Sequence, residues 1–458
     1  MVVATTIANG TLVTPTGMID GGVAIDDGQI VAIGDERTLP DAERTIDASD
    51  CLVFPGVVDP HVHIDDHVSI DTYETATKAA ALGGVTTVID FGWQAYSGPS
   101  SPWEKPGSLT EGIERKKKKG ANAAIDFSLH GGILRESEAL FSEIPALVEN
   151  GITSFKLYST YDFGLSNGYA RRVFEAVANE DGVAVGHTED DSVCRALTER
   201  LREGGETDPE RLADARPGYA EAMAADDYAR LAKATGAKYY GFHTAAGSAA
   251  NALARYHEDG SQIRAEACVH HTTLTRSTHA ERGNLAKLTP PLRTNKDIDE
   301  LFDQLTGGVL KVVSTDHVAQ LRERKERTEW WEDPFGANGL QRSLTVFHDE
   351  AVNRRDLSYP FLVRTMCTNP ARTFGLSQKG TLEPGTDADI VVFDPNETHT
   401  IDATDNASLA DYSLYDGRTV TGRVQTTLLR GTVVAENGEI VTSNAGQFLK
   451  RDRPTWEP

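Results

Sequence analysis

The stretch P-G-V-V-D-P-H-V-H-I-D-D, residues 55–66, decides the fold class of this chain. It ends a short apolar run with two histidines, His61 and His63, and side chains two residues apart on a strand point to the same side. Both imidazoles can therefore reach one metal ion. An isolated H-x-H pair is weak evidence, but four later apolar runs each end in another candidate ligand: Lys156, His187, His243 and Asp316. This array predicts a metal-dependent hydrolase.

Eight short apolar runs alternate with longer segments of helical periodicity through the middle of the chain. The runs begin at residues 52, 84, 124, 152, 182, 238, 262 and 309. Such alternation is typical of a parallel sheet built from βα units. Eight units predict a TIM-like (β/α)8 barrel, whose active site lies at the carboxyl ends of its strands. The candidate ligands stand at the ends of runs one, four, five, six and eight, where such a site requires them.

The two ends of the chain share a different sequence pattern, which predicts short strands separated by turns. D-D-G at 26–28 lies between alternating apolar residues and is a hairpin signal. Similar patterns return at 388–395 and 433–441. We therefore expect both ends to join into one small β-sandwich domain. The expected division is 1–51 for its N-terminal part, 52–375 for the barrel, and 376–458 for its C-terminal part and tail.

The charge balance limits the classes of partner. The 458 residues carry 69 Asp and Glu against 45 Lys and Arg, a net charge of −24. Such a surface argues against binding nucleic acid or an anionic membrane. Two readings of the acidic, lysine-poor composition remain open, adaptation to high salt or simple solubility. The one basic run, residues 116–119, falls at the end of an expected helix and is interpreted as a solvated helix terminus.

Cysteine usage and the N-terminus bear on the cellular compartment. Four scattered cysteines with no C-x-x-C pair predict neither a disulfide framework nor a thiolate metal site. The first residues lack a basic region, and no apolar run approaches the ~20 residues of a membrane span. We expect a cytoplasmic protein without a membrane partner.

Lys156 is the unusual candidate ligand. In I-T-S-F-K-L-Y, strand alternation places it on the same face as Ser154 and Tyr158. An ammonium group that points into a barrel is costly unless it is paired. Either it bonds a nearby carboxylate, or it loses its proton near metal cations and captures CO2 as a carbamate that bridges two of them. Neutral imidazole and carboxylate ligands suit Zn²⁺. Other histidines compete for ligand roles: His130, His270, His271 and His317.

The ligand set resembles that of the amidohydrolase superfamily, in the branch of dihydropyrimidinases, hydantoinases, allantoinases and dihydroorotases. The similarity covers nearly the whole chain and includes residues 73–90, N-P-A-R-T-F-G-L at 369–376 and K-G-T-L-E-P-G-T-D-A-D-I-V-V-F-D at 379–394. The resemblance implies one metal on His61, His63 and Asp316 and a second on His187 and His243. Carbamylated Lys156 and a hydroxide would bridge the two metals, and Asp316 would carry the proton during catalysis.

Details within this branch favour the enzymes that act on cyclic diamides. Dihydroorotases carry an arginine two residues after the second histidine, where this chain has Asp65. Tyr161 matches the tyrosine that supports the oxyanion in hydantoinases. Thr289, in L-T-P-P-L-R, replaces a serine whose backbone carbonyl holds the ring imide, and Phe335 aligns with an asparagine that contacts the imide through its backbone. The resemblance thus implies substrate contacts at Asp65, Tyr161, Thr289 and Phe335.

The expected reaction is hydrolysis of a dihydropyrimidine or hydantoin ring to an N-carbamoyl amino acid, with a small neutral cyclic ureide as substrate. An allantoinase is the main alternative, followed by a dihydroorotase. Some relatives are non-catalytic scaffolds that have lost metal ligands, but all six ligand positions are kept here. The resemblance also implies a homo-oligomer, either a tetramer or a dimer.

Overall fold

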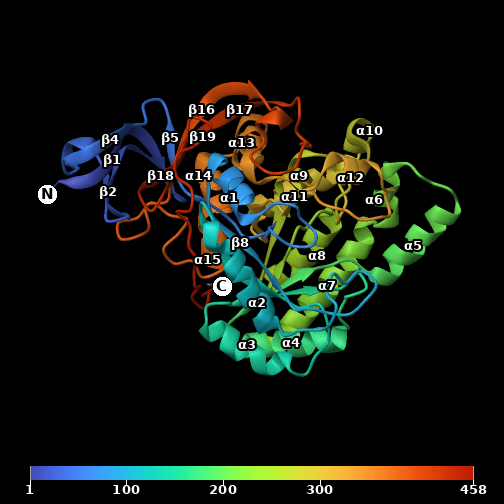
Figure 1. The fold of residues 1–458 in the computed structure, drawn as a ribbon. Coiled ribbons are helices and arrows are strands. Elements are labelled where there is room, and N and C mark those ends of the chain that lie inside the picture. The colour runs from blue at the N-terminus through green and yellow to red at the C-terminus, as the bar shows by residue number, and fades with distance from the viewer. Residues whose placement is uncertain (1, 457–458) are drawn as a thin grey trace.

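The computed structural model describes residues 2–456 and contains a parallel β-barrel beside a β-rich domain (Figure 1). The barrel strands lie in sequence order, each parallel to the next. This arrangement confirms the predicted TIM-like architecture. The eight strands are β6 (Val57–Asp59), β8 (Val85–Trp93), β9 (Asp126–Gly132), β10 (Ser154–Tyr158), β11 (Val183–His187), β12 (Lys238–Gly241), β13 (Ile263–Cys268) and β14 (Leu310–Ser314).

Contacts between the first and last strands bring the barrel close to closure. Thr315, just after β14, bonds through its hydroxyl to the Asp59 carboxylate at the end of β6, at 2.6 Å. Beyond these ends, the short strands β7 (Val62–His63) and β15 (His317–Val318) pair in parallel. The segments that carry the first two histidines and Asp316 are therefore held side by side.

Helices cover the outside of the barrel. Several begin at a side-chain cap, and capping boxes at Thr72, Ser108 and Thr294 satisfy backbone N–H groups at three of these helix starts. The longer helices are α1 (Tyr73–Leu82), α2 (Leu109–Lys119), α3 (Leu140–Glu149), α4 (Asn167–Asn179), α5 (Asp191–Glu203), α7 (Gly218–Thr235), α8 (Gly247–Glu258) and α11 (Asn295–Gly307). The shorter ones are α6 (Leu212–Ala215), α9 (Val269–Thr273), α10 (Thr278–Arg282), α12 (Arg322–Glu326), α13 (Ser343–His348), α14 (Tyr359–Val363) and α15 (Asn369–Thr373).

The two ends of the chain form one sheet, as expected. Strand β5 (Leu52–Pro55) pairs in parallel with β1 and antiparallel with β16, so it joins the N-terminal and C-terminal strands. Ile7, Val23, Ile390 and Leu428 share one buried core. The other strands of this sheet are β1 (Val3–Val13), β2 (Met18–Asp26), β3 (Gln29–Gly34), β4 (Ala42–Asp47), β16 (Ile390–Thr400), β17 (Thr419–Leu429), β18 (Thr432–Glu436) and β19 (Glu439–Ile440).

Two local features refine the sequence expectations. The D-D-G hairpin forms, with positive φ at Asp27 (47°) and Gly28 (78°), as a two-residue turn between twisted strands requires. The first apolar run does not form one strand. It divides at Gly56 between the two sheets, where a Cβ would lie 2.1 Å from the Thr86 hydroxyl oxygen. A periodicity argument cannot detect that division.

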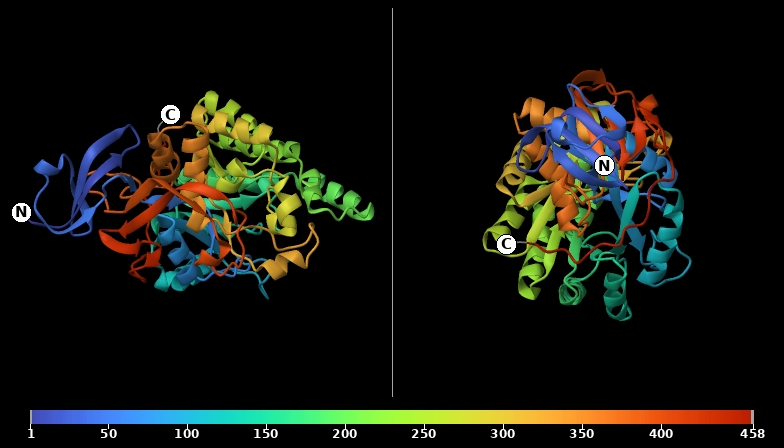
Figure 2. Two further views of the ribbon diagram at one scale, coloured as in Figure 1. Left: turned by 90° about the horizontal axis from the view of Figure 1, so that it is seen from above. Right: turned by 90° about the vertical axis from the view of Figure 1, so that its left-hand side faces the viewer.

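The C-terminal tail crosses one end of the barrel (Figure 2). Its backbone bonds to segments beside the barrel strands, including Gly446 N–H to the Ala123 carbonyl and Leu449 N–H to the Phe127 carbonyl. These bonds lie at the amino end of β9, so the tail leaves the carboxyl ends of the strands uncovered. Among residues 2–456, no helix has the length and apolar character needed to cross a membrane.

Candidate metal centre and active site

The six predicted ligands meet in one cavity. They come from β6, β7, β10, β11, β12 and β14 or from the residues directly after these strands, so strand order alone places them at the carboxyl end of the barrel. The cavity has a volume of about 430 Å³. Its walls include His61, His63, Lys156, His187, His243 and Asp316.

One half of the centre gathers around Asp316. The Oδ1 atom of Asp316 lies 3.2 Å from Nε2 of His61 and 3.3 Å from Nε2 of His63. Potential ligand atoms of His61, His243 and Asp316 all lie within 4.8 Å of one another. Two imidazole nitrogens and a carboxylate oxygen at this separation can close around one cation.

The other half contains His187, the lysine and the opposite side of His243, which lies between the two halves. The ring centroids of His187 and His243 are 4.4 Å apart. Lys156 is fully buried, and among the described residues its Nζ has no hydrogen-bonding partner. Burial lowers the pKa of this amine to about 7. The alternative in which Lys156 bonds a nearby carboxylate is therefore not the arrangement found.

Three residues of the site adopt left-handed backbone conformations. They follow strand ends: Tyr161 has φ 74°, His243 φ 35° and Asp316 φ 46°. Side chains with a Cβ rarely adopt this region, and such strain persists where the surrounding structure enforces it, often at functional sites. Here the sharp turns direct all three side chains into the cavity.

Neighbouring charges shift the pKa values of the site residues in opposite directions. Burial opposes protonation of His63, but hydrogen bonds and charge attraction from Asp316 and Asp66 raise its pKa to about 9. Burial opposes ionisation of Asp316, yet His61 and His63 lower its pKa to about 2. His187 is different, because its burial lowers the pKa to about 4. At neutral pH Asp316 is thus ionised and His187 neutral, the states in which they bind a cation, whereas His63 must release its proton to become a ligand.

Glu266 is a site residue that the sequence analysis missed. It is fully buried on β13, and its Oε1 lies 2.6 Å from Nδ1 of His61 and 3.1 Å from the backbone nitrogen of His243. As the acceptor for Nδ1–H, Glu266 leaves Nε2 of His61 free to bind a cation. The sequence carried one sign of this role, because Glu266 stands within the apolar run Q-I-R-A-E-A-C-V. A buried strand tolerates a charged side chain only when that charge has a partner.

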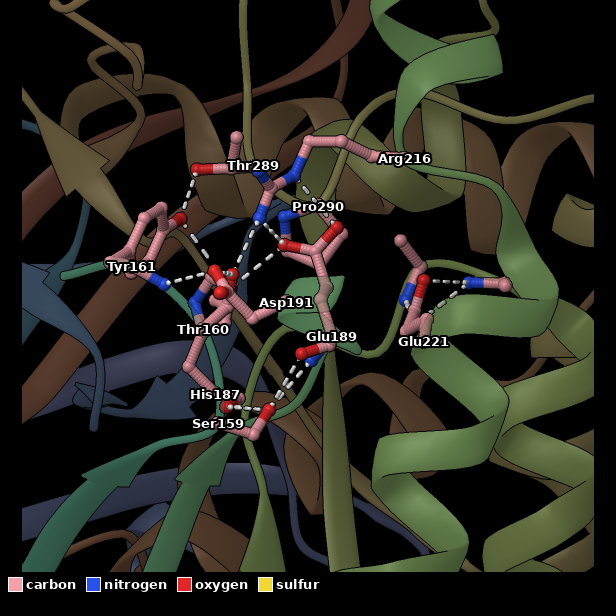
Figure 3. A network of polar contacts seen from close by, with 12 residues as sticks. Ser159, Thr160, Tyr161, His187, Glu189, Asp191, Arg216, Glu221, Thr289 and Pro290 are labelled. Carbon is pink, nitrogen blue, oxygen red and sulfur yellow. Dashed lines mark hydrogen bonds and ion pairs between the residues drawn. The ribbon is translucent and has the colours of Figure 1, made fainter. Parts of the chain in front are cut away.

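A second missed carboxylate, Glu189, stands two residues after His187. Its Oε2 lies 2.9 Å from Nε2 of His187. Arg216 forms an ion pair with both carboxylate oxygens, at 2.9 and 2.6 Å (Figure 3). The guanidinium also lies over the Tyr161 ring, 5.3 Å from its centroid. Glu189 is 1% exposed, so this ion pair is largely screened from water.

The predicted substrate contacts divide into two groups. Tyr161, Thr289 and Phe335 line the cavity, and the Tyr161 hydroxyl donates a hydrogen bond to the Thr289 hydroxyl at 2.9 Å (Figure 3). Asp65 does not reach the cavity. Its left-handed backbone (φ 49°) turns the chain, and its carboxylate pairs with Lys119 at 2.7 Å beside a separate cavity.

The lysine run at 116–119 corrects another expectation, since it is not wholly a solvated helix end. Lys116 is 4% exposed and pairs with Asp90 at 3.0 Å and with Asp66 at 3.6 Å. Asp66 also accepts a hydrogen bond from the indole of Trp93. The Asp66 carboxylate lies 3.8 Å from Nδ1 of His63, a predicted metal ligand. Lys116 therefore holds in place a carboxylate that faces the metal centre.

Three of the competing histidines are held outside the ligand set by other partners. His130 bonds the Pro60 carbonyl, His271 the Pro290 carbonyl, and His317 the Asp71 carboxylate. The predicted ligand set then comprises four imidazoles, one carboxylate and the buried Lys156 amine, which has no hydrogen-bonding partner among the described residues. Nδ1 of His243 is also buried without a hydrogen-bonding partner among residues 2–456. This donor set fits two divalent cations with nitrogen and oxygen ligands.

The barrel and its centre define a metal-dependent hydrolase of the TIM-barrel type, and the comparisons identify the family. The amidohydrolase family matches residues 52–434. The chain therefore belongs to the amidohydrolase family. The retained ligand set, together with this membership, argues against a scaffold that has lost its metals.

Relatives that align over nearly their full length indicate the branch of the family. The chain is 34% identical to a D-hydantoinase of Ralstonia pickettii, over 97% of this chain and 98% of that protein. It is 31% identical to an L-hydantoinase of Paenarthrobacter aurescens, over 97% of both. Among solved structures, a dihydropyrimidinase of Brevibacillus agri superposes with a TM-score of 0.92 at 29% identity, covering 99% of this chain and 100% of that one. These similarities confirm the predicted branch.

Proposed function

We propose that this protein is a binuclear metal-dependent hydrolase that opens the cyclic amide bond of hydantoins or dihydropyrimidines and yields N-carbamoyl amino acids. One observation carries the proposal: a buried lysine amine without a hydrogen-bonding partner among the described residues stands among four histidines and an ionised aspartate in a single cavity. Hydantoinase relatives over the full length of the chain support the substrate class.

The ligands divide into two sets. His61, His63 and Asp316 would hold one cation, and His187 and His243 the other. Lys156, carbamylated by CO2, would supply an oxygen to each. Two cations, most simply Zn²⁺, would lower the pKa of water and polarise the substrate carbonyl. Glu266 and Glu189 accept the second ring protons of His61 and His187, which fixes the tautomers that ligands need.

Asp316 and Tyr161 have separate catalytic roles in this proposal. The Asp316 carboxylate, ionised because its pKa is lowered to about 2, accepts a proton from the attacking water and returns it to the leaving ring nitrogen. The Tyr161 hydroxyl donates a hydrogen bond to the oxygen that becomes negative during attack. Burial raises the pKa of this phenol, which keeps it protonated as a donor.

The remaining cavity wall orients the ring. Backbone groups at Thr289 and Phe335 would bond the imide, and the aromatic face of Phe335 would contact the substituent side. Asp162 and Asp333 line the cavity together with one guanidinium, that of Arg324. A substrate with an added carboxylate would meet this excess of negative charge, which favours neutral cyclic ureides.

Assembly and location follow from the same proposal. We expect a homo-oligomer, a tetramer or a dimer, in the cytoplasm. Four free cysteines suit a reducing compartment.

A panel of substrates on one metal-replete preparation tests the function. The kcat/KM values for dihydrouracil and a 5-substituted hydantoin should exceed that for dihydroorotate at least about tenfold, a difference of ~1.4 kcal/mol in transition-state free energy. A preference for dihydroorotate would contradict the assignment. A clear preference for allantoin over both other ureides would instead support the allantoinase alternative.

A further inference from the structure

The buried ion pair of Glu189 and Arg216 touches both halves of the catalytic machinery. Glu189 contacts a histidine of the second cation position, and Arg216 covers the ring of the proposed oxyanion donor (Figure 3). Nε2 of His187 also lies 3.4 Å from the Tyr161 hydroxyl. One connected unit is therefore formed by the side chains of Glu189, Arg216, His187 and Tyr161. A displacement of one of these side chains also displaces those that it contacts.

The pair is built into the fold at several points. Glu189 N–H donates to the Ser159 hydroxyl, and that hydroxyl donates to the Glu189 carbonyl. The Arg216 carbonyl accepts a hydrogen bond from the Arg293 guanidinium at 2.5 Å. The Tyr161 backbone N–H donates to the Asp191 carboxylate at 3.1 Å. The pair is thus fixed from several elements, which makes it a rigid reference for the two groups that it contacts.

We propose that the Glu189–Arg216 ion pair is a positioning unit that couples the second cation site to the oxyanion donor Tyr161. As acceptor for Nε2–H of His187, Glu189 leaves Nδ1 for the cation and fixes the ring plane. By holding the guanidinium over the phenol, Glu189 also sets the ring position of Tyr161. A change at Glu189 then reaches both groups, although it touches neither substrate nor cation. This inference rests on the proposed function both for the second cation position and for the role of Tyr161 as oxyanion donor.

Glu189→Gln keeps the shape but removes the charge, and Asp126→Asn is the matched control. Asp126 is also a buried carboxylate with ion-pair partners, Lys379 and Arg430, but it lies at the amino end of β9. Chelator competition on the full-length protein should show that Glu189→Gln weakens the second cation by about 10–100-fold and leaves the first unchanged. Asp126→Asn should lower the melting temperature yet keep both affinities.

A double-mutant cycle tests the coupling itself. Tyr161→Phe should lower kcat less in the Glu189→Gln background than in the wild type, with KM little changed, because the phenol is already displaced there. Wild-type affinity for both cations in Glu189→Gln, or additive losses in kcat, would overturn the inference. The chelator measurement requires no substrate, so it remains decisive even if the substrate panel fails.

A further group of buried donors lies beside the catalytic centre, where the sequence predicted no thiolate metal site; the Cys268 sulfur is also within 4.8 Å of donor atoms of His61 and Glu266. Donor atoms of Cys268, His270 and His271 all lie within 4.8 Å of one another, and the three side chains are at most 6% exposed. His271 donates its Nε2 proton to the Pro290 carbonyl at 3.0 Å, which leaves a lone pair on Nδ1. Among the described residues that Nδ1, like Nε2 of His270, has no hydrogen-bonding partner.

We infer that Cys268, His270 and His271 form a third cation site, selective for a thiophilic divalent metal such as Zn²⁺ or Cd²⁺. A thiol and two neutral imidazoles are the donors that such ions prefer, and a carbonyl that orients one of them is typical of metal-binding histidines. Binding would ionise the thiol and release its proton, so the affinity should rise with pH.

Titration with Cd²⁺ of protein whose two catalytic positions are filled tests this site. The wild type should bind one further equivalent with a thiolate-to-metal absorption band in the ultraviolet. Cys268→Ser and His271→Gln should lose both the band and the extra equivalent, while Cys194→Ser, at another buried cysteine, should keep them. No third equivalent and no band in the wild type, or a band lost equally in Cys194→Ser, would overturn the assignment.

Discussion

Two buried lysines at opposite ends of the barrel have opposite surroundings. At the amino end, Nζ of Lys379 lies 2.7 Å from Asp126, 2.9 Å from Asp387 and 2.8 Å from Asp389. At the carboxyl end, Nζ of Lys156 has no hydrogen-bonding partner among the described residues. The carboxylates raise the pKa of Lys379, whereas burial lowers that of Lys156 to about 7.

The difference separates stability from function. A charge that is fully paired holds two parts of the chain together, here β9 and the segment before β16. A polar group left unpaired in the interior costs free energy that folding does not recover. Proteins retain such a polar group where a bound ligand supplies its missing partner. The amino end of the barrel is thus a structural junction, and the carboxyl end is the reactive one.

Replacing Lys156 should have the largest effect. Lys156→Ala removes the bridge between the two cation positions, so we expect loss of most metal and a fall in turnover of more than about 10⁴-fold. Short carboxylic acids should restore part of both, because they can occupy the vacated position. Metal analysis and kcat with and without added propionate measure this. A variant with full metal content and near-normal turnover would remove Lys156 from the centre.

Asp316→Asn separates ligation from proton transfer. The amide oxygen can still bind a cation but cannot accept a proton, so kcat should fall by about 10²–10⁴-fold while metal content persists. Parallel metal analysis and steady-state kinetics distinguish the two effects. Turnover within a few-fold of the wild type would assign the proton to another group.

Tyr161→Phe removes one donor without changing the shape of the cavity. We expect a loss of about 10²–10³-fold in kcat, the usual cost of deleting a donor to a developing oxyanion. Both cations should remain bound, because the phenol is not in the proposed ligand set. An unchanged kcat would show that the oxyanion is supported elsewhere.

Replacing Lys379, the lysine with three carboxylate partners, should lower stability without changing activity. Lys379→Met removes the cation that three carboxylates share, and of these Asp126 keeps Arg430 as a partner. Losing one partner of a buried ion pair typically costs about 3–5 kcal/mol. Denaturant unfolding measures that loss. At a temperature where the variant is folded, its kcat should stay within about twofold of the wild type. A large fall in kcat would mean that the two ends of the barrel are coupled.

The pH dependence of stability provides the smallest effect and a check on sign. In metal-free, CO2-free buffer, the folded pKa of Lys156 is about 7, below its ordinary value of 10.5. Between these values the unfolded chain binds more protons, so the penalty of the buried amine is full below about pH 7 and shrinks as pH rises toward 10.5. Lys156→Met should therefore be more stable than the wild type at about pH 6, with a smaller advantage at about pH 9. An advantage that grows with pH would contradict the lowered pKa.

The sequence predicted the barrel and its ligands because strand periodicity and strand ends fix both. His61, His187 and Asp316 stand where a short apolar run stops, and parallel strands bring such ends together. Glu189 was missed although it stands two residues after His187, because its ion pair with Arg216 forms only in the fold. Glu266 was missed because its partner is distant in sequence. Glu266 contacts His61 from 205 residues away. Asp65 was misplaced because spacing from His63 does not reveal a left-handed turn or a lysine on α2.

A high-resolution crystal structure of the metal-replete protein tests the central claim most directly. We predict two cation peaks in the cavity, with extra density on Nζ of Lys156 that has the planar three-atom shape of a carbamate and contacts both. Two bound cations beside a free Lys156 amine would contradict it.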